Sequence, residues 1–247
     1  MRRIVLYELM SPDGVAEEPG NWMCDVDRAT TGAVFLRYAR SLKPLRSHDA
    51  YRVGRGGTMA APNESVVVLS RALDQAGDVL AAVHADQLAQ PTPCGDWDVA
   101  QLIGHLVNAP VRFLEMARGA EPDWSSAPRP VASNWVAEFR SNADDLIHHW
   151  HQAGAAADAG QVDWQTAEIA VHTWDVARAT GQSPSLLPEV AARGLAFMSA
   201  MLTPDNRGEV FAPAVPVPDD APVYDRLAAF AGRAVGRRTD AARPADG

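Results

Sequence analysis

The stretch Glu168-Ile-Ala-Val-His-Thr-Trp-Asp-Val-Ala-Arg-Ala-Thr-Gly-Gln182 decides both the fold and the site that this chain is expected to have. It belongs to a predicted helix from about Val162 to Thr180, and Gly181 supplies the signal that ends it. Glu168 and His172 are four residues apart, so their side chains stand on one helix face, about 5 to 6 Å apart at Cβ. This spacing suits two ligands of one metal ion.

A third candidate ligand, His105, lies on a different predicted helix. Its neighbours at positions 102, 103, 106 and 107 are apolar, so its ring is expected to face the interior, where an imidazole needs a polar partner. One carboxylate and two imidazoles leave a coordination position open, which is typical of a catalytic zinc site, and nickel, iron or manganese accept the same donors. Spacing alone leaves a plainer interpretation open, namely an exposed helix pair and a core histidine.

The rest of the chain after Met59 reads as amphipathic helices joined by loops, which predicts a mainly α fold. A bundle of four helices followed by two short C-terminal helices is expected, with a metal or ligand held between facing helices in its core. The expected N-caps of the first three helices are Asn63, Asp96 and Ser133. The predicted helices span Asn63 to Leu88, Asp96 to Arg118, Ser133 to Gln152, Val162 to Thr180, Pro188 to Met201 and Tyr224 to Ala234.

Bulk composition excludes several classes of function. With 247 residues, of which 47% are hydrophobic, the chain is long enough to bury a full core. A net charge of -9 gives no electrostatic reason to bind nucleic acid or anionic lipid. Two cysteines are too few for a disulfide framework, and no apolar run is long enough to span a membrane. We therefore expect a soluble cytoplasmic protein, monomeric or homodimeric.

Two long blocks carry a family resemblance. Thr92-Pro-Cys-Gly-Asp-Trp-Asp-Val-Ala-Gln-Leu-Ile-Gly-His-Leu106 and the 168–182 stretch resemble the signatures of actinobacterial DinB-like proteins related to mycothiol-dependent maleylpyruvate isomerase. A third block, from Arg207 to Arg233, agrees as well, and the three cover about 63–233. The resemblance implies a DinB-like four-helix bundle whose metal ligands are His105, Glu168 and His172.

The resemblance also implies a chemistry. A divalent metal, zinc first and nickel or iron as alternatives, would bind the sulfur of a low-molecular-weight thiol such as mycothiol and favour the thiolate. The thiolate would attack a small electrophile, giving a metal-dependent thiol transferase or isomerase. The isomerase has a further C-terminal domain that we do not find in this sequence, so maleylpyruvate itself is not the expected substrate. A non-catalytic metal-binding or stress-response protein of the same fold is the alternative.

The first 58 residues do not show the helical pattern of the rest of the chain. Arg3-Ile-Val-Leu-Tyr-Glu-Leu-Met10 predicts a strand, and the segment resembles the opening of dihydrofolate reductase-like proteins related to the C-terminal domain of the riboflavin-pathway reductase. The resemblance stops before any nicotinamide-binding part. We therefore expect a truncated, non-functional α/β fragment at 1–58, the metal-binding bundle at 59–235 and a disordered tail at 236–247. A gene-fusion remnant and a true start at Met59 both remain open as explanations.

Several other polar or reactive residues have a structural and a functional interpretation. Asp175 either orients a metal ligand or pairs with Arg178, and Cys94 is expected to be a packed thiol. The remaining candidates are expected to have structural roles: the solvated histidines His148, His149 and His151, the core residues Trp97 and Trp174, and the paired or surface residues Arg207, Arg226 and Arg233.

Overall fold

The computed structural model describes residues 63–95, 97–122, 130–131, 133–204, 207 and 212–235. The reductase-like segment, the candidate start at Met59 and the tail 236–247 lie outside these residues, so the domain boundaries predicted there stay predictions. The described residues form α2 (Glu64–Ala81), α3 (Val99–Ala117), α4 (Trp135–Ala153), α5 (Ala159–Ala179), α6 (Pro188–Met201) and α7 (Val223–Phe230). Two short 3-10 turns, Ala85–Gln87 and Gly154–Ala156, complete the regular structure of this part.

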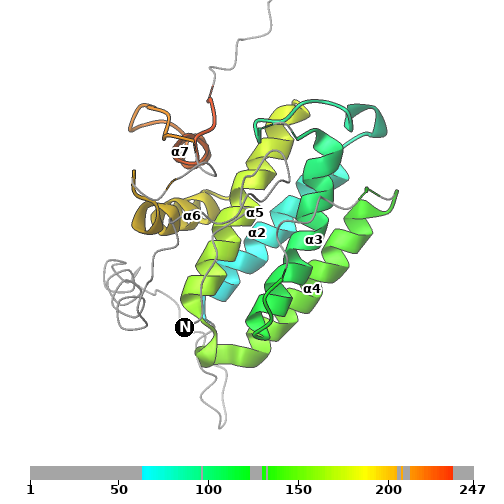
Figure 1. Ribbon diagram of the computed structural model, residues 1–247, viewed down its shortest axis with the longest axis vertical. Coiled ribbons are helices and arrows are strands. Elements are labelled where there is room, and N and C mark those ends of the chain that lie inside the picture. Colours follow the sequence, from blue (N-terminus) through cyan, green and yellow to red (C-terminus); the bar gives the residue numbers. More distant parts are fainter. Residues whose placement is uncertain are drawn as a thin grey trace, which may run out of the picture.

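Four of the helices form a bundle. Helix α2 packs against α4 and α5, and α3 packs against the same two helices, so α2 and α3 occupy opposite corners. Helix α6 packs on α5 and α2 outside the bundle, and α7 packs on α6 and α5 (Figure 1). The predicted mainly α fold, a DinB-like bundle with two C-terminal helices, is thereby confirmed for the described residues. None of these helices combines the length and the apolar character that crossing a membrane requires.

The predicted helix starts were right in one case and wrong in two. Asn63 caps α2, its side chain accepting from the Ser65 N–H at 3.1 Å. The cap of α3 is Asp98 rather than Asp96, because Asp98 and Gln101 each accept from the other's backbone N–H and form a capping box. Helix α4 begins at Trp135, not at a cap supplied by Ser133.

The helix ends show similar differences. Helix α2 stops at Ala81 rather than Leu88, because the chain enters the 3-10 turn whose Gln87 side chain accepts from the His84 N–H at 2.9 Å. Helix α5 starts at Ala159, earlier than predicted, with Asp158 as its cap. Gly181 ends α5 as expected, since it adopts a φ of 68° that other residues rarely take. Helix α6 has its predicted bounds, and α7 ends at Phe230 rather than Ala234.

Helix α5 lies at the centre of the structure. It contacts α2, α3, α6 and α7, and nearly all of its residues from 160 to 177 are buried. Gly194 of α6 allows close packing on this helix, because a Cβ there would lie 3.1 Å from the Ala167 Cα. Polar side chains on α5 are therefore held in the interior and need partners there.

Candidate metal centre

The three predicted ligands meet between α3 and α5 in the bundle interior. His105 Nε2 lies 2.7 Å from Glu168 Oε1, and His172 Nε2 lies 3.3 Å from the same oxygen. One ligand atom from each residue lies within 4.8 Å of both others. The structure thus brings together residues that the sequence separates by more than 60 positions.

This donor set fits a divalent metal ion. Four tetrahedral ligands about 2.1 Å from zinc stand about 3.4 Å from one another, so the 3.3 Å between His172 Nε2 and Glu168 Oε1 already fits, and the 2.7 Å between His105 Nε2 and the same oxygen has to widen by about 0.7 Å. The exposed fractions of His105, Glu168 and His172 are 6%, 2% and 0%, so a buried carboxylate faces two imidazoles with little water to solvate it. Buried carboxylates are costly unless paired with cations or coordinated to metals. The three residues therefore form a group able to hold one ion.

Local sequence explains where each ligand points. The capping box at Asp98 and Gln101 fixes the start of α3 and places His105 about two turns further along the helix. Glu168 and His172 lie on adjacent turns of α5, four residues apart, and their side chains interact directly. The carboxylate of Glu168 is thus shared between its own helix and α3.

Asp175 and Arg233 support His172 from the other side. His172 Nδ1 donates to Asp175 Oδ2 at 3.1 Å, which leaves Nε2 directed towards Glu168. Arg233 donates through Nε to Asp175 Oδ1 at 3.2 Å and through a terminal nitrogen to Oδ2 at 2.7 Å. Asp175 therefore orients His172, one of the two roles considered for it, and its arginine partner is Arg233 rather than Arg178. The apolar run around Arg233 was the available signal for a buried pairing.

The electrostatics of the cluster favour one protonation state. Burial opposes the charge on His172, but Glu168, Cys94 and the hydrogen bond to Asp175 outweigh it and raise the pKa of this imidazole. Burial lowers the pKa of His105 despite its hydrogen bond to Glu168. Burial alone would raise the pKa of Glu168, yet His172 and His105 bring it below its ordinary value. Near pH 7 these directions favour an ionised Glu168, a protonated His172 and a neutral His105 in the metal-free protein.

The loop before α3 covers the two imidazoles. The Trp97 ring centroid lies 5.0 Å from that of His105 and 6.3 Å from that of His172. Thr92 fixes the loop, because its hydroxyl donates to the Trp97 carbonyl at 2.9 Å and accepts from the Cys94 N–H at 3.1 Å. Trp97 is buried, as expected for a core residue, and it also packs directly against the site.

Cys94 belongs to a second group of donors with His172 and Asp175, whose ligand atoms lie within 4.8 Å of one another. Cys94 is buried and reduced, as predicted for a packed thiol, although its contact with His172 was not foreseen. Arg233 already neutralises Asp175, so a cation placed in this group would meet a guanidinium at close range. We therefore interpret Cys94 and Asp175 as surroundings of His172 rather than as a second cation site.

Other sequence candidates lie away from the centre. His148 is exposed and interacts with Gln152, and neither group of potential metal donors in the described residues includes it, His149 or His151. Arg207 donates to the carbonyls of Ala212 and Phe230. Arg226 is exposed. These residues have the structural or surface roles expected of them.

Comparison with known proteins identifies the family. The profile of the mycothiol maleylpyruvate isomerase N-terminal domain matches residues 69–177. Two uncharacterised proteins from two strains of Mycobacterium tuberculosis are each 35% identical to the chain over 181 residues, which are 67% of this chain and 95% of each relative. The chain belongs to the mycothiol maleylpyruvate isomerase N-terminal domain family. No solved structure matches it significantly.

The match to the mycothiol maleylpyruvate isomerase N-terminal domain contains all three candidate ligands and also Asp175. Arg233 lies outside the matched range, in the segment that follows α7. The same comparison contains no finding on the reductase-like resemblance of 1–58, which stays a prediction.

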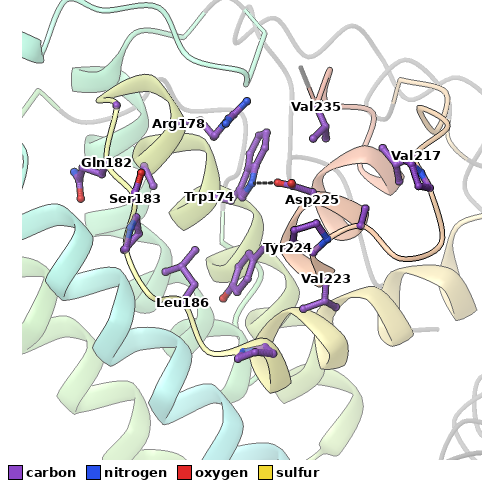
Figure 2. A pocket seen from close by; sticks show the side chains of 17 residues that line it. Trp174, Arg178, Gln182, Ser183, Leu186, Val217, Val223, Tyr224, Asp225 and Val235 are labelled. Atoms are coloured by element: carbon purple, nitrogen blue, oxygen red, sulfur yellow. Dashed lines mark hydrogen bonds between the residues drawn. The ribbon is translucent and has the colours of Figure 1, made fainter. Parts of the chain in front are cut away.

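A separate cavity of about 800 Å³ lies between the C-terminal part of α5, the linker to α6, and α7. Figure 2 shows Trp174 at its centre, with the Trp174 Nε1–H donating to Asp225 at 3.1 Å. Trp174 is buried in the core, as expected, and it also lines this cavity. None of the three candidate metal ligands lines the cavity, so it is distinct from the candidate metal centre.

Proposed function

We propose that the chain binds one divalent metal ion through His105 Nε2, Glu168 and His172 Nε2, with zinc as the first candidate. The convergence of two imidazole nitrogens on one buried carboxylate oxygen is the observation that carries the proposal. The mycothiol named in the family description supports a low-molecular-weight thiol as co-substrate. The activity proposed is that of a thiol-dependent S-transferase or isomerase acting on a small electrophile.

A divalent ion bound by these residues would supply Lewis acidity that lowers the pKa of a thiol beside it. Two neutral imidazoles and one carboxylate leave a bound dication with one net positive charge, and the neighbouring Asp175 and Arg233 charges cancel. That residual charge favours an anionic thiolate over a neutral thiol.

The chain's own residues prepare this site. Asp175 accepts from His172 Nδ1 and so keeps Nε2 free for the ion. Trp97 packs against both imidazoles and limits the access of water to them. Among the described residues, we identify no further side chain as a general acid or base, so proton transfers to the substrate are left to the thiol and to water.

Elemental analysis of the purified protein tests the metal. Protein prepared without chelators and offered zinc, nickel and iron is expected to retain close to one equivalent of one of them, and His172→Ala is expected to lose it. His148→Ala is the matched control, because this exposed histidine lies on α4 away from the ligands. Retention of less than a tenth of an equivalent by the unaltered protein would contradict the proposal.

Turnover separates the enzyme from a non-catalytic metal-binding protein. An electrophile panel with added mycothiol is expected to be consumed by the metal-loaded protein and not by His105→Ala, provided that circular dichroism shows a folded variant. Metal binding without thiol-dependent turnover of any electrophile would leave the non-catalytic alternative as the function.

A further inference from the structure

Arg233 reaches the candidate metal centre from a part of the chain far from the ligands. It is 58 residues from Asp175 in sequence, it is only 5% exposed, and both oxygens of the Asp175 carboxylate accept from its guanidinium. The same carboxylate accepts from His172 Nδ1. A continuous path of hydrogen bonds therefore runs from Arg233 through Asp175 to a candidate ligand.

The backbone around Arg233 is built to hold it there. The Arg233 N–H donates to the Ala228 carbonyl at 2.9 Å, and its guanidinium also donates to the Ala231 carbonyl at 3.1 Å. Gly232 takes a φ of 85°, and a Cβ at this position would lie 2.8 Å from Ala212. Only glycine fits both restraints, so the chain turns here in one way and delivers the next side chain inward.

Helix α7 is fastened to α5 independently of Arg233. Trp174 on α5 donates to Asp225 on α7, as the dashed line in Figure 2 shows. Since Asp175 follows Trp174 directly in sequence, two neighbouring residues of α5 are tied to the α7 region by different side chains. The position of Arg233 relative to His172 is thus set by more than its own ion pair.

We propose that Arg233 is a positioning residue of the metal centre, which holds Asp175 and thereby fixes the orientation of His172 for metal binding. This inference rests on the proposed function. It adds to the metal centre a residue outside 69–177, the range that the family profile matches. A guanidinium donates two parallel hydrogen bonds in a planar fork and so fixes the carboxylate plane, whereas an ammonium acts as a point charge. Without this fork, Asp175 would be a buried carboxylate with one imidazole as its remaining partner and a less defined direction.

The test measures metal affinity rather than turnover. Zinc dissociation constants from chelator competition are compared for the unaltered protein, Arg233→Gln, Asp175→Asn and the double variant. Each single substitution is expected to weaken binding about 10- to 100-fold, the range typical for partners of metal ligands. The double variant is expected to bind no more weakly than Asp175→Asn, because both changes interrupt one path. Arg207→Gln is the control, since Arg207 also holds the C-terminal segment, through the carbonyls of Ala212 and Phe230 and the Phe230 ring, and neither of these residues belongs to the candidate metal centre.

A merely structural role for Arg233 predicts a different pattern. If Arg233 only held the C-terminal segment in place, Arg233→Gln would weaken metal binding by the same factor with and without Asp175. The weakening in the double variant would then be the product of the factors in the two single variants. The visible absorption of the cobalt-loaded protein gives a second readout, which Arg233→Gln is expected to change and Arg207→Gln to leave unaltered. If Arg233→Gln does not fold, Arg233→Lys replaces it and is expected to bind metal more weakly than the unaltered protein.

The two proposals fail in different ways. Unaltered zinc affinity in the folded Arg233 variant, or multiplicative effects in the double variant, would overturn the positioning role while the metal site stands. Absence of metal binding by the unaltered protein would overturn the proposed function itself, and this inference with it.

Discussion

Replacing Glu168 by glutamine should have a small effect on the stability of the metal-free protein and a large effect on the stabilisation that zinc provides. In the metal-free protein the carboxylate lies 3.3 Å from His172 Nε2. Coulomb's law with an effective dielectric constant of about 20 gives about 5 kcal/mol of attraction at that distance. Keeping two ions out of water costs several kcal/mol for each, so the two terms nearly cancel. Glu168 is also the main group that raises the pKa of His172, so glutamine at position 168 lets this imidazole lose its proton, and no unpaired charge stays buried. We therefore expect Glu168→Gln to change the free energy of unfolding of the metal-free protein by less than about 2 kcal/mol.

The response to metal should change far more. Free zinc at one hundred times the dissociation constant stabilises a protein by about 2.7 kcal/mol. In a domain of about 150 to 250 residues, each kcal/mol raises the midpoint of thermal unfolding by about 2 to 4 °C, so a rise of about 5 to 11 °C is expected. Glu168→Gln removes the anionic ligand and should abolish the rise, measured by calorimetry with and without zinc.

Glu115→Gln is the matched control, because Glu115 is an exposed residue of α3. It should retain the full rise in the unfolding midpoint. An equal rise in Glu168→Gln and the unaltered protein would refute the role of Glu168 as a ligand. A large loss of stability in metal-free Glu168→Gln would instead refute the cancellation argued from the buried pair.

Four further predictions concern zinc binding at different pH values, the packing of α6 on α5 and the cap of α3. Between pH 6.5, the ordinary pKa of histidine, and the raised pKa of His172, zinc binding should release close to one proton, because the ion displaces the proton on Nε2. Calorimetry in buffers of different ionisation enthalpy measures the number of protons released. A result of no released proton near pH 7 would contradict the protonated state assigned to His172. In the same range zinc affinity should fall about tenfold for each pH unit lost. Gly194→Ala should be less stable than Gly77→Ala by about 1 to 3 kcal/mol, although both variants gain the same helix propensity. The new Cβ at position 194 meets the α5 backbone, whereas the new Cβ at position 77 meets the exposed Arg140 side chain, which can move aside. Equal midpoints of urea unfolding for the two variants would refute this prediction. Asp98→Ala should cost about 1 kcal/mol in urea unfolding through loss of the α3 cap, and Asp86→Ala, at an exposed residue of the 3-10 turn, should cost less.

The helical pattern of the sequence predicted most of the fold of the described residues. Apolar spacing located the helices of the described residues, and Pro188 and Gly181 marked boundaries correctly because they act through their own backbone geometry. Caps were less predictable, since Asp96 and Asp98 are equally good cap residues and only the reciprocal bond with Gln101 selects the second. Periodicity alone could not place α2 opposite α3, because that arrangement depends on contacts between distant helices.

The sequence predicted that His105, Glu168 and His172 would lie together, but it did not predict their surroundings. The spacing of Glu168 and His172 follows from local helix geometry, and His105 was singled out by its apolar neighbours before the family resemblance supported it. Asp175, three residues after His172, was a candidate partner from the sequence, but two further neighbours come from distant parts of the chain: Cys94 in the loop before α3 contacts His172, and Arg233 after α7 contacts Asp175. The apolar neighbours of Arg233 were the local sign that its guanidinium is buried, but tertiary packing decides that it, rather than Arg178, reaches Asp175.

The burial of the three candidate ligands would determine how quickly a bound ion is exchanged. His172 has no exposed surface, and Trp97 packs against both imidazoles. An ion can enter or leave only when part of this cover moves aside, so the exchange rate is set by the frequency of local opening rather than by diffusion to the site. Slow exchange would let a cell fix the identity of the metal when the protein first folds, and later changes in metal supply would then reach this centre with delay.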